Sequence, residues 1–287
     1  MSSTEPDIRT RIARLFVYPV KSCAGVELTE AVLTETGIDL DRAWMVVDEE
    51  GEFVSQRELP RMALVKPQLK HTEVVLRAPG MLALHLAVDQ VEKPMKVRVW
   101  DDGVDAWDMG DIAAQWFSDF LGRKLRIVRF DPEFRRLSSM QWTKEVEAPN
   151  QFTDGFPLLV ASEGSLAELN RRLVEGGNAA VGIERFRPNI LLAGLEAHDE
   201  DRFDELRIAA DPEVRLKPVK PCARCTIPDV DPATAATSTV VADTMRSYRA
   251  NDIVGGAVTF AMNCIVLEGL DATLRVGQEV TANWAFA

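Results

Sequence analysis

Two of the four cysteines of this chain lie in one short segment, Lys220-Pro-Cys-Ala-Arg-Cys-Thr226. Lys220 and Arg224 stand beside the thiols of Cys222 and Cys225, and cationic neighbours favour the thiolate, the form that binds metals or attacks electrophiles. Prolines within the segment and on both sides of it fix the backbone and remove hydrogen-bond donors. The segment is therefore predicted to be a stiff loop or strand end that presents a thiolate.

Four kinds of site could use such a pair of cysteines. A zinc site needs a second pair of ligands, but Cys23 and Cys264 are far apart in the sequence and the three histidines form no cluster. A thioredoxin-like dithiol opens a helix, whereas Thr226–Pro232 is poor helix sequence. Two buried, unreactive thiols are also compatible with the sequence. The fourth alternative, which we take as the working hypothesis, is one thiolate bound to a soft metal centre.

Three further segments place basic and amide side chains at predicted turns and strand starts. They are Tyr18-Pro-Val-Lys-Ser-Cys-Ala-Gly25, Asp39-Leu-Asp-Arg-Ala-Trp44 and Phe186-Arg-Pro-Asn-Ile190. An arginine offers a rigid fork of donors to a phosphate or a planar heterocycle, a lysine offers a point charge, and an asparagine offers both a donor and an acceptor. Each segment alone is typical of an ordinary surface charge or ion pair. Together they suit an anionic, hydrogen-bond-rich cofactor held next to a thiolate.

The composition limits the class of protein. With 287 residues, of which 46% are hydrophobic and 27% charged, the chain is long enough for one large or two ordinary globular domains. The formal net charge of −12 argues against general affinity for nucleic acid or membrane surfaces. The polar, acidic N-terminus, the lack of a long apolar stretch and the few cysteines indicate a soluble protein of a reducing compartment. We therefore expect a cytoplasmic protein, and a monomer because no heptad seam is present.

Most of the chain reads as β-strands with a few helices. Alternating or β-branched runs predict strands over 11–20, 26–35, 43–48, 52–56, 74–76, 82–88, 97–99, 186–192, 206–209 and 274–283. Apolar spacing predicts helices over 111–121, 162–173 and 239–249, with Asp108 or Asp111 capping the first and Ser162 the second. The polar stretch 133–150 is the best candidate for a boundary or long loop. These elements predict an α+β fold dominated by antiparallel sheet that closes into barrels.

Further motifs accompany the cysteine and basic segments, in order along the chain. They are Asp154-Gly-Phe-Pro157 leading into Ala161-Ser-Glu-Gly-Ser-Leu166, Val230-Asp-Pro232, Ser247-Tyr-Arg249 and Val276-Gly-Gln-Glu-Val280. In this whole set the chain resembles the MOSC-domain proteins with an N-terminal MOSC β-barrel domain, a family that includes the mitochondrial amidoxime-reducing component and bacterial relatives. The resemblance implies an N-terminal β-barrel-like domain over 8–130 and a MOSC β-barrel domain over 131–287.

The resemblance also implies a molybdenum cofactor, in which a pterin dithiolene with a terminal phosphate chelates an oxo-molybdenum centre. Cys225 matches the family's protein ligand to the metal, and a soft thiolate suits that centre. Asp154 matches an acidic residue near the metal, a proton donor if a dry site raises its pKa, or else an orienting group. The positions implied to bind the cofactor or to lie beside the thiolate are Lys21, Ser22, Arg42, Arg187, Asn189 and Arg224. Binding of pyridoxal phosphate is not expected.

The activity implied by the resemblance is reduction of N-hydroxylated small molecules such as hydroxylamines, amidoximes and N-hydroxylated bases. The sequence contains no four-cysteine iron–sulfur motif, so the electrons are expected from a separate ferredoxin-, flavodoxin- or cytochrome b5-like protein and its reductase. The alternative is a non-redox cofactor-binding or sulfur-carrier protein with a persulfide on Cys222 or Cys225. That alternative stays open because MOSC domains also occur attached to cysteine desulfurases.

Two segments depart from the family pattern. Pro228-Asp229 stands where many members carry two threonines, and this change is expected to replace hydroxyl donors near the metal and to alter substrate preference. Phe260-Ala-Met-Asn263 replaces the usual Phe-Gly-Gln-Asn, and this change is expected to alter the geometry of a loop.

Overall fold

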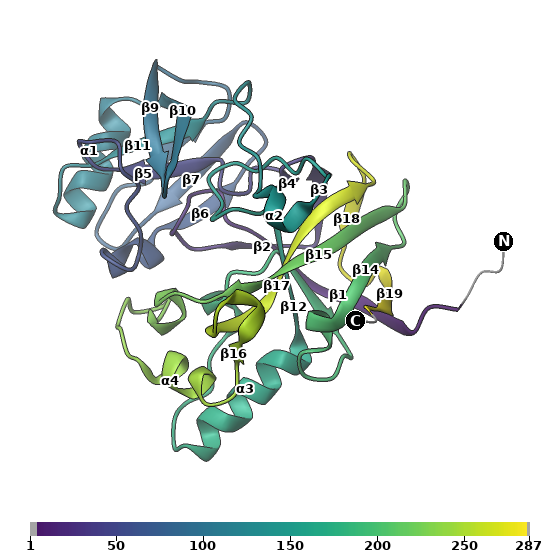
Figure 1. Ribbon diagram of the computed structural model, residues 1–287. Helices are drawn as coiled ribbons and strands as arrows, with labels where there is room; N and C mark the ends of the chain where they lie inside the picture. The colour runs from purple at the N-terminus through teal and green to yellow at the C-terminus, as the bar shows by residue number, and fades with distance from the viewer. Residues whose placement is uncertain (1–4, 286–287) are drawn as a thin grey trace.

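β-Branched and aromatic residues dominate the runs that form strands, and the computed structural model, which describes residues 5–285, contains nineteen strands and four α-helices in that part of the chain. The elements form two β-rich parts that lie side by side, the first part at upper left in Figure 1 and a barrel at lower right. No helix of the described residues is long and apolar enough to cross a membrane. The mainly antiparallel α+β architecture confirms the predicted fold class.

Seven strands form the closed barrel. In spatial order they are β12 (Leu158–Ser162), β13 (Ile190–Ala193), β1 (Ile8–Val17), β19 (Glu279–Trp284), β14 (Phe203–Ile208), β15 (Val214–Ala223) and β17 (Ala257–Glu268), and β17 pairs back with β12. All neighbours are antiparallel except β12 and β13. Buried apolar side chains such as Ile12, Leu15 and Leu216 fill the interior. Because the circuit is closed, its strands have no free edge and form a rigid support for the residues at their ends.

Short strands extend the barrel at its rim. β2 (Val26–Leu28) pairs with β1, and β16 (Ala250–Asn251) pairs with β17. A separate sheet contains β18 (Thr273–Arg275), β3 (Glu30–Thr34) and β4 (Gly37–Ile38). Strand β1 lies in the barrel, whereas β5 (Trp44–Val47) to β11 (Arg126–Phe130), later in the chain, build the other part of the molecule. The predicted division of the chain into 8–130 and 131–287 stays a prediction.

Two helices cover the outside of the barrel. α3 (Glu163–Glu175) connects the parallel strands β12 and β13, which need a crossover of this kind. The Ser162 hydroxyl accepts a hydrogen bond from Ser165 N at 3.1 Å, which confirms the predicted N-cap. α4 (Val240–Arg246) packs against α3, and the two share an apolar core with the barrel (Figure 1).

The first part of the molecule consists of two sheets and a helix. One sheet has the order β5 (Trp44–Val47), β11 (Arg126–Phe130), β10 (Asp102–Asp108), β9 (Lys93–Val99), and the other β6 (Lys66–Leu69), β7 (Glu73–Arg77), β8 (Leu84–Ala87). α1 (Asp111–Leu121) packs on β11 and spans the predicted residues. Its N-cap is Gly110 rather than an aspartate, and Asp108 Oδ1 accepts a hydrogen bond from Gly110 N at 2.7 Å.

Several predicted elements differ from the structure. The single strand predicted over 274–283 is two strands, because the chain turns at Gly277 with a φ of 89°. The strand predicted over 186–192 begins only at Ile190, after a left-handed residue and a proline. Residues 52–56 form two isolated bridges, at Glu52 and Phe53, instead of a strand, and 26–35 is divided into β2 and β3. The stretch 133–150 is the expected long loop, with one turn of helix, α2 (Met140–Thr143).

Candidate functional site

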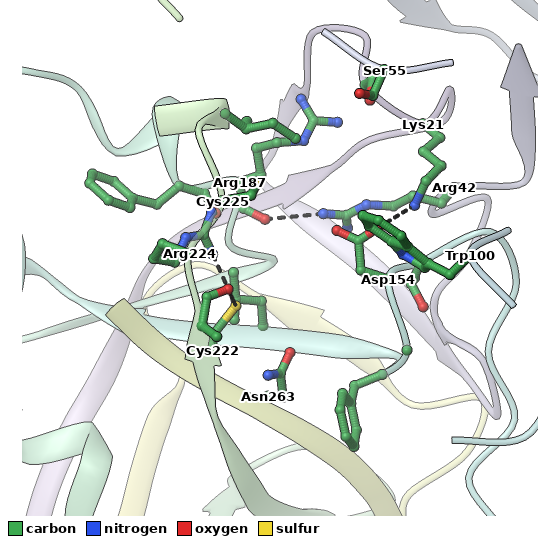
Figure 2. Close-up of a pocket in the computed structure, with 18 of the residues that line it drawn as sticks. Lys21, Arg42, Ser55, Trp100, Asp154, Arg187, Cys222, Arg224, Cys225 and Asn263 are labelled. Atoms are coloured by element: carbon green, nitrogen blue, oxygen red, sulfur yellow. Dashed lines mark hydrogen bonds and ion pairs between the residues drawn. The ribbon is translucent and has the colours of Figure 1, made fainter. Parts of the chain in front are cut away.

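A cleft of about 420 Å³ opens between the barrel and the first part of the molecule, with residues of both parts along its walls (Figure 2). All eight site residues proposed from the sequence line it, namely Lys21, Ser22, Arg42, Asp154, Arg187, Asn189, Arg224 and Cys225. They come from five segments that are far apart in the sequence. The fold thus brings the whole set together, while the role of each residue stays a prediction.

The two cysteines at the end of β15 differ in exposure. β15 ends at Ala223, and the segment after it exposes Cys225 to the cleft while Cys222 is half-buried. Cys222 Sγ accepts a hydrogen bond from Arg224 Nη1 at 3.0 Å (Figure 2). Arg224 Nη2 donates to the Phe186 carbonyl at 3.0 Å. Arg224 therefore ties the cysteine segment to the arginine segment beside it, and the Cys225 thiol stays open to a ligand.

The environments of the four free cysteines bear on the alternatives raised by the sequence. Burial raises the pKa of Cys23 to about 12 and also raises the pKa of Cys264, so these two are unreactive. Only a 3-10 turn, Ile227–Asp229, follows Cys225, which therefore gains no helix dipole of the thioredoxin kind. Among residues 5–285 no three His, Cys, Asp or Glu side chains are placed to hold a metal ion, so a zinc site gains no support. An exposed Cys225 also does not fit a pair of buried thiols.

Lys21 and Asp154 form an ion pair on the wall of the cleft (Figure 2). Lys21 Nζ lies 2.5 Å from Asp154 Oδ1 and donates to the Phe152 carbonyl at 2.8 Å. The lysine side chain is 7% exposed, whereas the Asp154 side chain is 65% exposed because it faces the open cleft. Burial lowers the pKa of Lys21, and attraction to Asp154 offsets part of that change.

The same pair sets the protonation state of Asp154. Partial desolvation raises the pKa of this carboxyl group, but the charge and the hydrogen bond of Lys21 outweigh that effect. The charge of Arg42 and the Trp100 indole N–H act in the same direction, so the pKa lies below its ordinary value. The raised pKa on which a proton-donor role would depend is therefore not found. Asp154 is a carboxylate at neutral pH, which favours the orienting role, and that role stays a prediction.

Two guanidinium groups pack on one buried tyrosine. The Cζ atoms of Arg42 and Arg187 lie 4.4 and 4.3 Å from the centroid of the Tyr18 ring. Arg42 pairs with the buried carboxylate of Asp41, and its Nη2 donates to the Arg187 carbonyl at 3.1 Å. Arg187 Nη1 donates to the Cys23 carbonyl at 2.6 Å, whereas its buried Nη2 has no partner within residues 5–285. Such a buried donor needs an acceptor, which a ligand in the cleft could supply.

Three of the site residues proposed from the sequence have a left-handed backbone. The φ angles are 65° at Ser22, 52° at Arg42 and 59° at Arg187. This conformation costs a residue other than glycine about 1–2 kcal/mol, and such strain is concentrated at functional sites. Backbone hydrogen bonds of 2.8 Å, from Lys21 N to the Trp44 carbonyl and from Arg42 N to the Tyr18 carbonyl, hold the segments in place.

Asn189 uses its side chain mainly inside the protein. Its Oδ1 accepts a hydrogen bond from Leu159 N at 3.1 Å, and its Nδ2 donates to the Phe16 carbonyl at 3.3 Å. The amide therefore ties β12 to β1 and is 1% exposed. Its geometry favours a positioning role over direct contact with a cofactor.

The two segments that depart from the family pattern have structural explanations. Asp229 is buried and its Oδ1 accepts a hydrogen bond from Ala242 N at 3.0 Å, near the start of α4. It does not line the cleft, so the expected change of hydroxyl donors near the metal is not supported. The expected loop at Phe260–Asn263 lies within strand β17, where Asn263 Nδ2 donates to the Lys220 carbonyl at 3.2 Å.

The cleft is strongly positive. Six cationic side chains and one carboxylate line it: Lys21, Arg42, Arg57, Arg187, Lys220, Arg224 and Asp154. In a chain with a net charge of −12 this local excess favours an anionic ligand.

Sequence reasoning missed the wall that the first part of the molecule contributes. Its residues include Phe53, Arg57 and Trp100. Arg57 lies in a run that resembles ordinary surface sequence. Trp100, however, begins the polar turn Trp-Asp-Asp-Gly103, and a large aromatic residue in such a turn is a signal that could have been used.

Comparison with known proteins agrees with this architecture. Residues 9–124 match the model of the MOSC N-terminal beta barrel domain, and residues 147–281 match that of the MOSC domain. The chain is 34% identical to mitochondrial amidoxime reducing component 2 of Rattus norvegicus over 253 residues, which are 84% of this chain and 73% of that protein. It is also 34% identical to mitochondrial amidoxime-reducing component 1 of Homo sapiens over 284 residues, which are 94% and 82% of the two chains.

A relative with a different name, a molybdenum cofactor sulfurase, aligns with this chain over only a small part of the sulfurase's own length. The molybdenum cofactor sulfurase of Bos taurus is 30% identical over 246 residues, which are 79% of this chain but 28% of the sulfurase. The two domain matches, and the similarity over most of the length of the amidoxime-reducing components, indicate the same family. This chain belongs to the MOSC-domain proteins with an N-terminal MOSC β-barrel domain, the family of the mitochondrial amidoxime-reducing components.

Proposed function

We propose that this protein is a molybdenum-cofactor-dependent reductase of N-hydroxylated compounds. The observation that carries the proposal is the exposed thiol of Cys225 in a positive cleft, where the buried Nη2 of Arg187 lacks a partner within residues 5–285. A soft sulfur donor suits molybdenum that already bears dithiolene sulfur, and cationic donors suit a terminal phosphate. The residues therefore fit the cofactor. The similarity to amidoxime-reducing components supports the choice of substrate class.

The roles of the residues follow from their chemistry. Cys225 would be the protein's ligand to the metal. Arg187 would donate from its unpaired Nη2, and Arg42 and Ser22 would present their polar groups from strained backbone positions. Arg224 would hold the cysteine segment against the Phe186 carbonyl. When bound, the cofactor supplies the two-electron chemistry that cleaves an N–O bond.

Asp154 would act on the substrate as a hydrogen-bond acceptor. Its carboxylate is held by Lys21 at 2.5 Å and by Trp100 Nε1 at 3.3 Å, so its position is fixed from two sides. The N–H or O–H of a hydroxylamine or amidoxime can donate to it, which would orient the N–O bond in the cleft. The proton that completes the release of water would come from solvent, because the cleft is open and Asp154 stays charged.

The electron source and the cellular location belong to the same proposal. The electrons would come from a separate ferredoxin-, flavodoxin- or cytochrome b5-like protein and its reductase. The amidoxime-reducing components are named as components, which is in accord with a system of several proteins. We propose a monomer in the cytoplasm.

The first test measures molybdenum by elemental mass spectrometry in wild type, Cys225→Ala and Cys222→Ala, all produced in a host that makes the cofactor. We expect about one molybdenum per chain in wild type, loss in Cys225→Ala and retention in the matched control Cys222→Ala. Reduction of hydroxylamine and benzamidoxime is then measured with a chemically reduced viologen, which removes the need for the natural donor. A folded wild type without molybdenum, or equal content in all three proteins, would refute the proposal.

A second function is favoured by the similarity to the molybdenum cofactor sulfurase and by the second thiol, Cys222, that Arg224 holds beside Cys225. In that case one cysteine carries a persulfide and no reduction takes place. Release of thiocyanate from the isolated protein on treatment with cyanide, without bound molybdenum, would establish this sulfur-carrier function instead.

A further inference from the structure

One wall of the cleft consists of an arginine packed on two aromatic rings. The Cζ atom of Arg57 lies 4.5 Å from the centroid of Trp100 and 5.6 Å from that of Phe53. The two rings meet edge to face, with centroids 4.9 Å apart and planes at 65°. All three residues belong to the first part of the molecule and line the cleft. We call these three residues the arginine wall.

Trp100 fixes the arginine wall next to the residue proposed to orient the substrate. Its indole Nε1 donates to Asp154 Oδ1 at 3.3 Å, across the boundary between the two parts (Figure 2). The residue lies between β9 and β10 with a φ of 57°, a conformation that is unfavourable for a bulky side chain. A strained tryptophan that is 44% exposed and held by a cleft carboxylate is a sign of function rather than of core packing.

The guanidinium group of Arg57 has N–H donors that no protein carboxylate among the described residues uses. Its Nε donates to Ser55 Oγ at 3.0 Å, and within residues 5–285 no carboxylate forms an ion pair with it. The neighbouring Glu58 lies 3.8 Å from Arg123 instead. The nearest cleft carboxylate, Asp154, is already paired with Lys21. The terminal N–H groups of Arg57 are therefore free for an anion in the cleft, and two parallel N–H donors match a carboxylate.

We infer that the cleft selects planar N-hydroxylated substrates that carry a carboxylate, and that Arg57 is the residue that binds this carboxylate. The inference rests on the proposed function and names its substrate class. A planar ring packs on the exposed face of Trp100, its N–OH group donates to Asp154, and its carboxylate accepts from Arg57. A cationic group at this position is disfavoured, because it would face the unpaired guanidinium of Arg57.

The test compares two amidoximes that differ only in charge. One is 4-carboxybenzamidoxime and the other is 4-carbamoylbenzamidoxime, in which a neutral amide replaces the carboxylate. The ratio of their kcat/KM values is measured with reduced viologen at low and high salt. A charge-assisted pair in an open cleft favours the acid by about tenfold. We expect this ratio in wild type, a ratio near one in Arg57→Gln, and an intermediate ratio in Arg57→Lys, which keeps the charge but loses the fork.

Two control variants separate a local effect from a general one. Arg61→Gln removes an arginine that packs on Phe120 away from the cleft, and it should keep the ratio of wild type. Lys220→Gln removes a cation from the opposite wall, where Lys220 Nζ lies 4.9 Å from the Trp142 ring centroid, and it should lower the ratio less than Arg57→Gln does. An equal fall in Lys220→Gln, or an unchanged ratio in Arg57→Gln, would overturn the role of Arg57.

A binding measurement keeps the inference testable without turnover. Isothermal titration compares 4-carbamoylbenzoate with terephthalamide, a pair of unreactive analogues with the same difference in charge. Wild type should bind the carboxylate about tenfold more tightly, and Arg57→Gln should bind the two equally. If neither amidoxime is reduced but this difference is found, the proposed reductase activity fails and the anion site stands. Reduction of both amidoximes at equal rates, with equal binding of the analogues, would refute the anion site and leave the reductase intact.

Discussion

Replacing Arg136 by methionine is expected to destabilise the protein, because this buried arginine holds the segment that carries Asp154. The Arg136 side chain is 5% exposed. Its Nη1 lies 2.6 Å from Asn150 Oδ1 and 2.8 Å from the carbonyl oxygens of Gln151 and Thr153. Its Nε donates to Asp102 Oδ2 in β10 at 2.8 Å. A single side chain thus connects the first part of the molecule to the residues just before Asp154.

The expected loss can be worked out from these contacts. Methionine keeps most of the apolar stem but leaves the carbonyl oxygens of Gln151 and Thr153 without their donor, at a cost of about 1 kcal/mol each. Asn150 Oδ1 keeps its hydrogen bond from Thr153 Oγ1 at 2.9 Å. The pair with Asp102 adds little, since that carboxylate is 53% exposed and such pairs contribute about 0.5 kcal/mol. The total is about 2.5 kcal/mol. With an unfolding entropy of about 2.1 cal/mol/K per residue, 287 residues give about 0.6 kcal/mol/K, so Tm should fall by about 4 °C.

The assay is urea and thermal unfolding followed by tryptophan fluorescence. The matched control is Arg135→Met, which removes the adjacent, half-exposed arginine and its surface pair with Glu147 at 3.0 Å. That change should cost less than about 0.5 kcal/mol. Arg136→Lys should recover only part of the loss, because an ammonium group cannot reproduce the planar fork. Equal stability of Arg136→Met and Arg135→Met would refute the reasoning.

Four further predictions follow from the same structure. Asp154→Asn should retain molybdenum but lower the reduction rate about tenfold or more through lost orientation of the substrate. In wild type the pKa of Asp154 lies below the ordinary 3.8, so kcat/KM should show no loss from protonation of this group down to about pH 5. Asp229→Ala should lower the free energy of unfolding in urea by about 1 kcal/mol, while Asp229→Asn keeps the acceptor and most of the stability. Burial raises the pKa of Glu200 above its usual 4.5, so the folded state binds a proton more tightly than the unfolded state does. The free energy of unfolding should therefore fall as pH rises through the folded pKa. Tm of wild type, measured from pH 5 to 8, should show this fall, and Tm of Glu200→Gln should not. Ser22→Gly should raise the free energy of unfolding by about 0.5 kcal/mol through relief of strain, Ser22→Ala should leave it unchanged, and both should bind molybdenum less well.

The elements that were predicted well are those whose signals are local. α1 and α3 have apolar residues at helical spacing and glycines beyond their C-termini, and both begin within a residue of the predicted start. The missed strands include β15, with the sequence Val-Arg-Leu-Lys-Pro-Val-Lys-Pro-Cys-Ala223, in which two prolines and three cations argue against a strand. The barrel tolerates them because bulges interrupt its pairing with β17 near Pro218 and Pro221. Pairing between distant segments therefore outweighed local propensity.

The residues of the candidate site could be predicted where they belong to short sequence motifs. The cysteine segment and the three basic segments are such motifs, and all four of them line the cleft. Arg57 could not be found in this way, because its significance depends on packing against Trp100, more than forty positions away in the sequence. The protonation state of Asp154 was equally hidden, since it depends on Lys21 from a distant part of the chain. Tertiary contacts, not residue types, decide both questions.

At three cleft positions with a left-handed backbone, the polar side chain matters more to the site than an unstrained backbone does. Glycine would adopt the φ values of Ser22, Arg42 and Arg187 with less strain, yet each position has a polar side chain instead. Core packing does not explain this choice, because Arg187 lacks a partner for its buried Nη2 among the described residues and its burial depresses its pKa to about 10. A fold that accepts both backbone strain and an incompletely paired buried charge is less stable than it could be. An anionic ligand in the cleft would satisfy the free donor and restore the pKa of Arg187, so the same features that weaken the protein alone would bind its cofactor tightly.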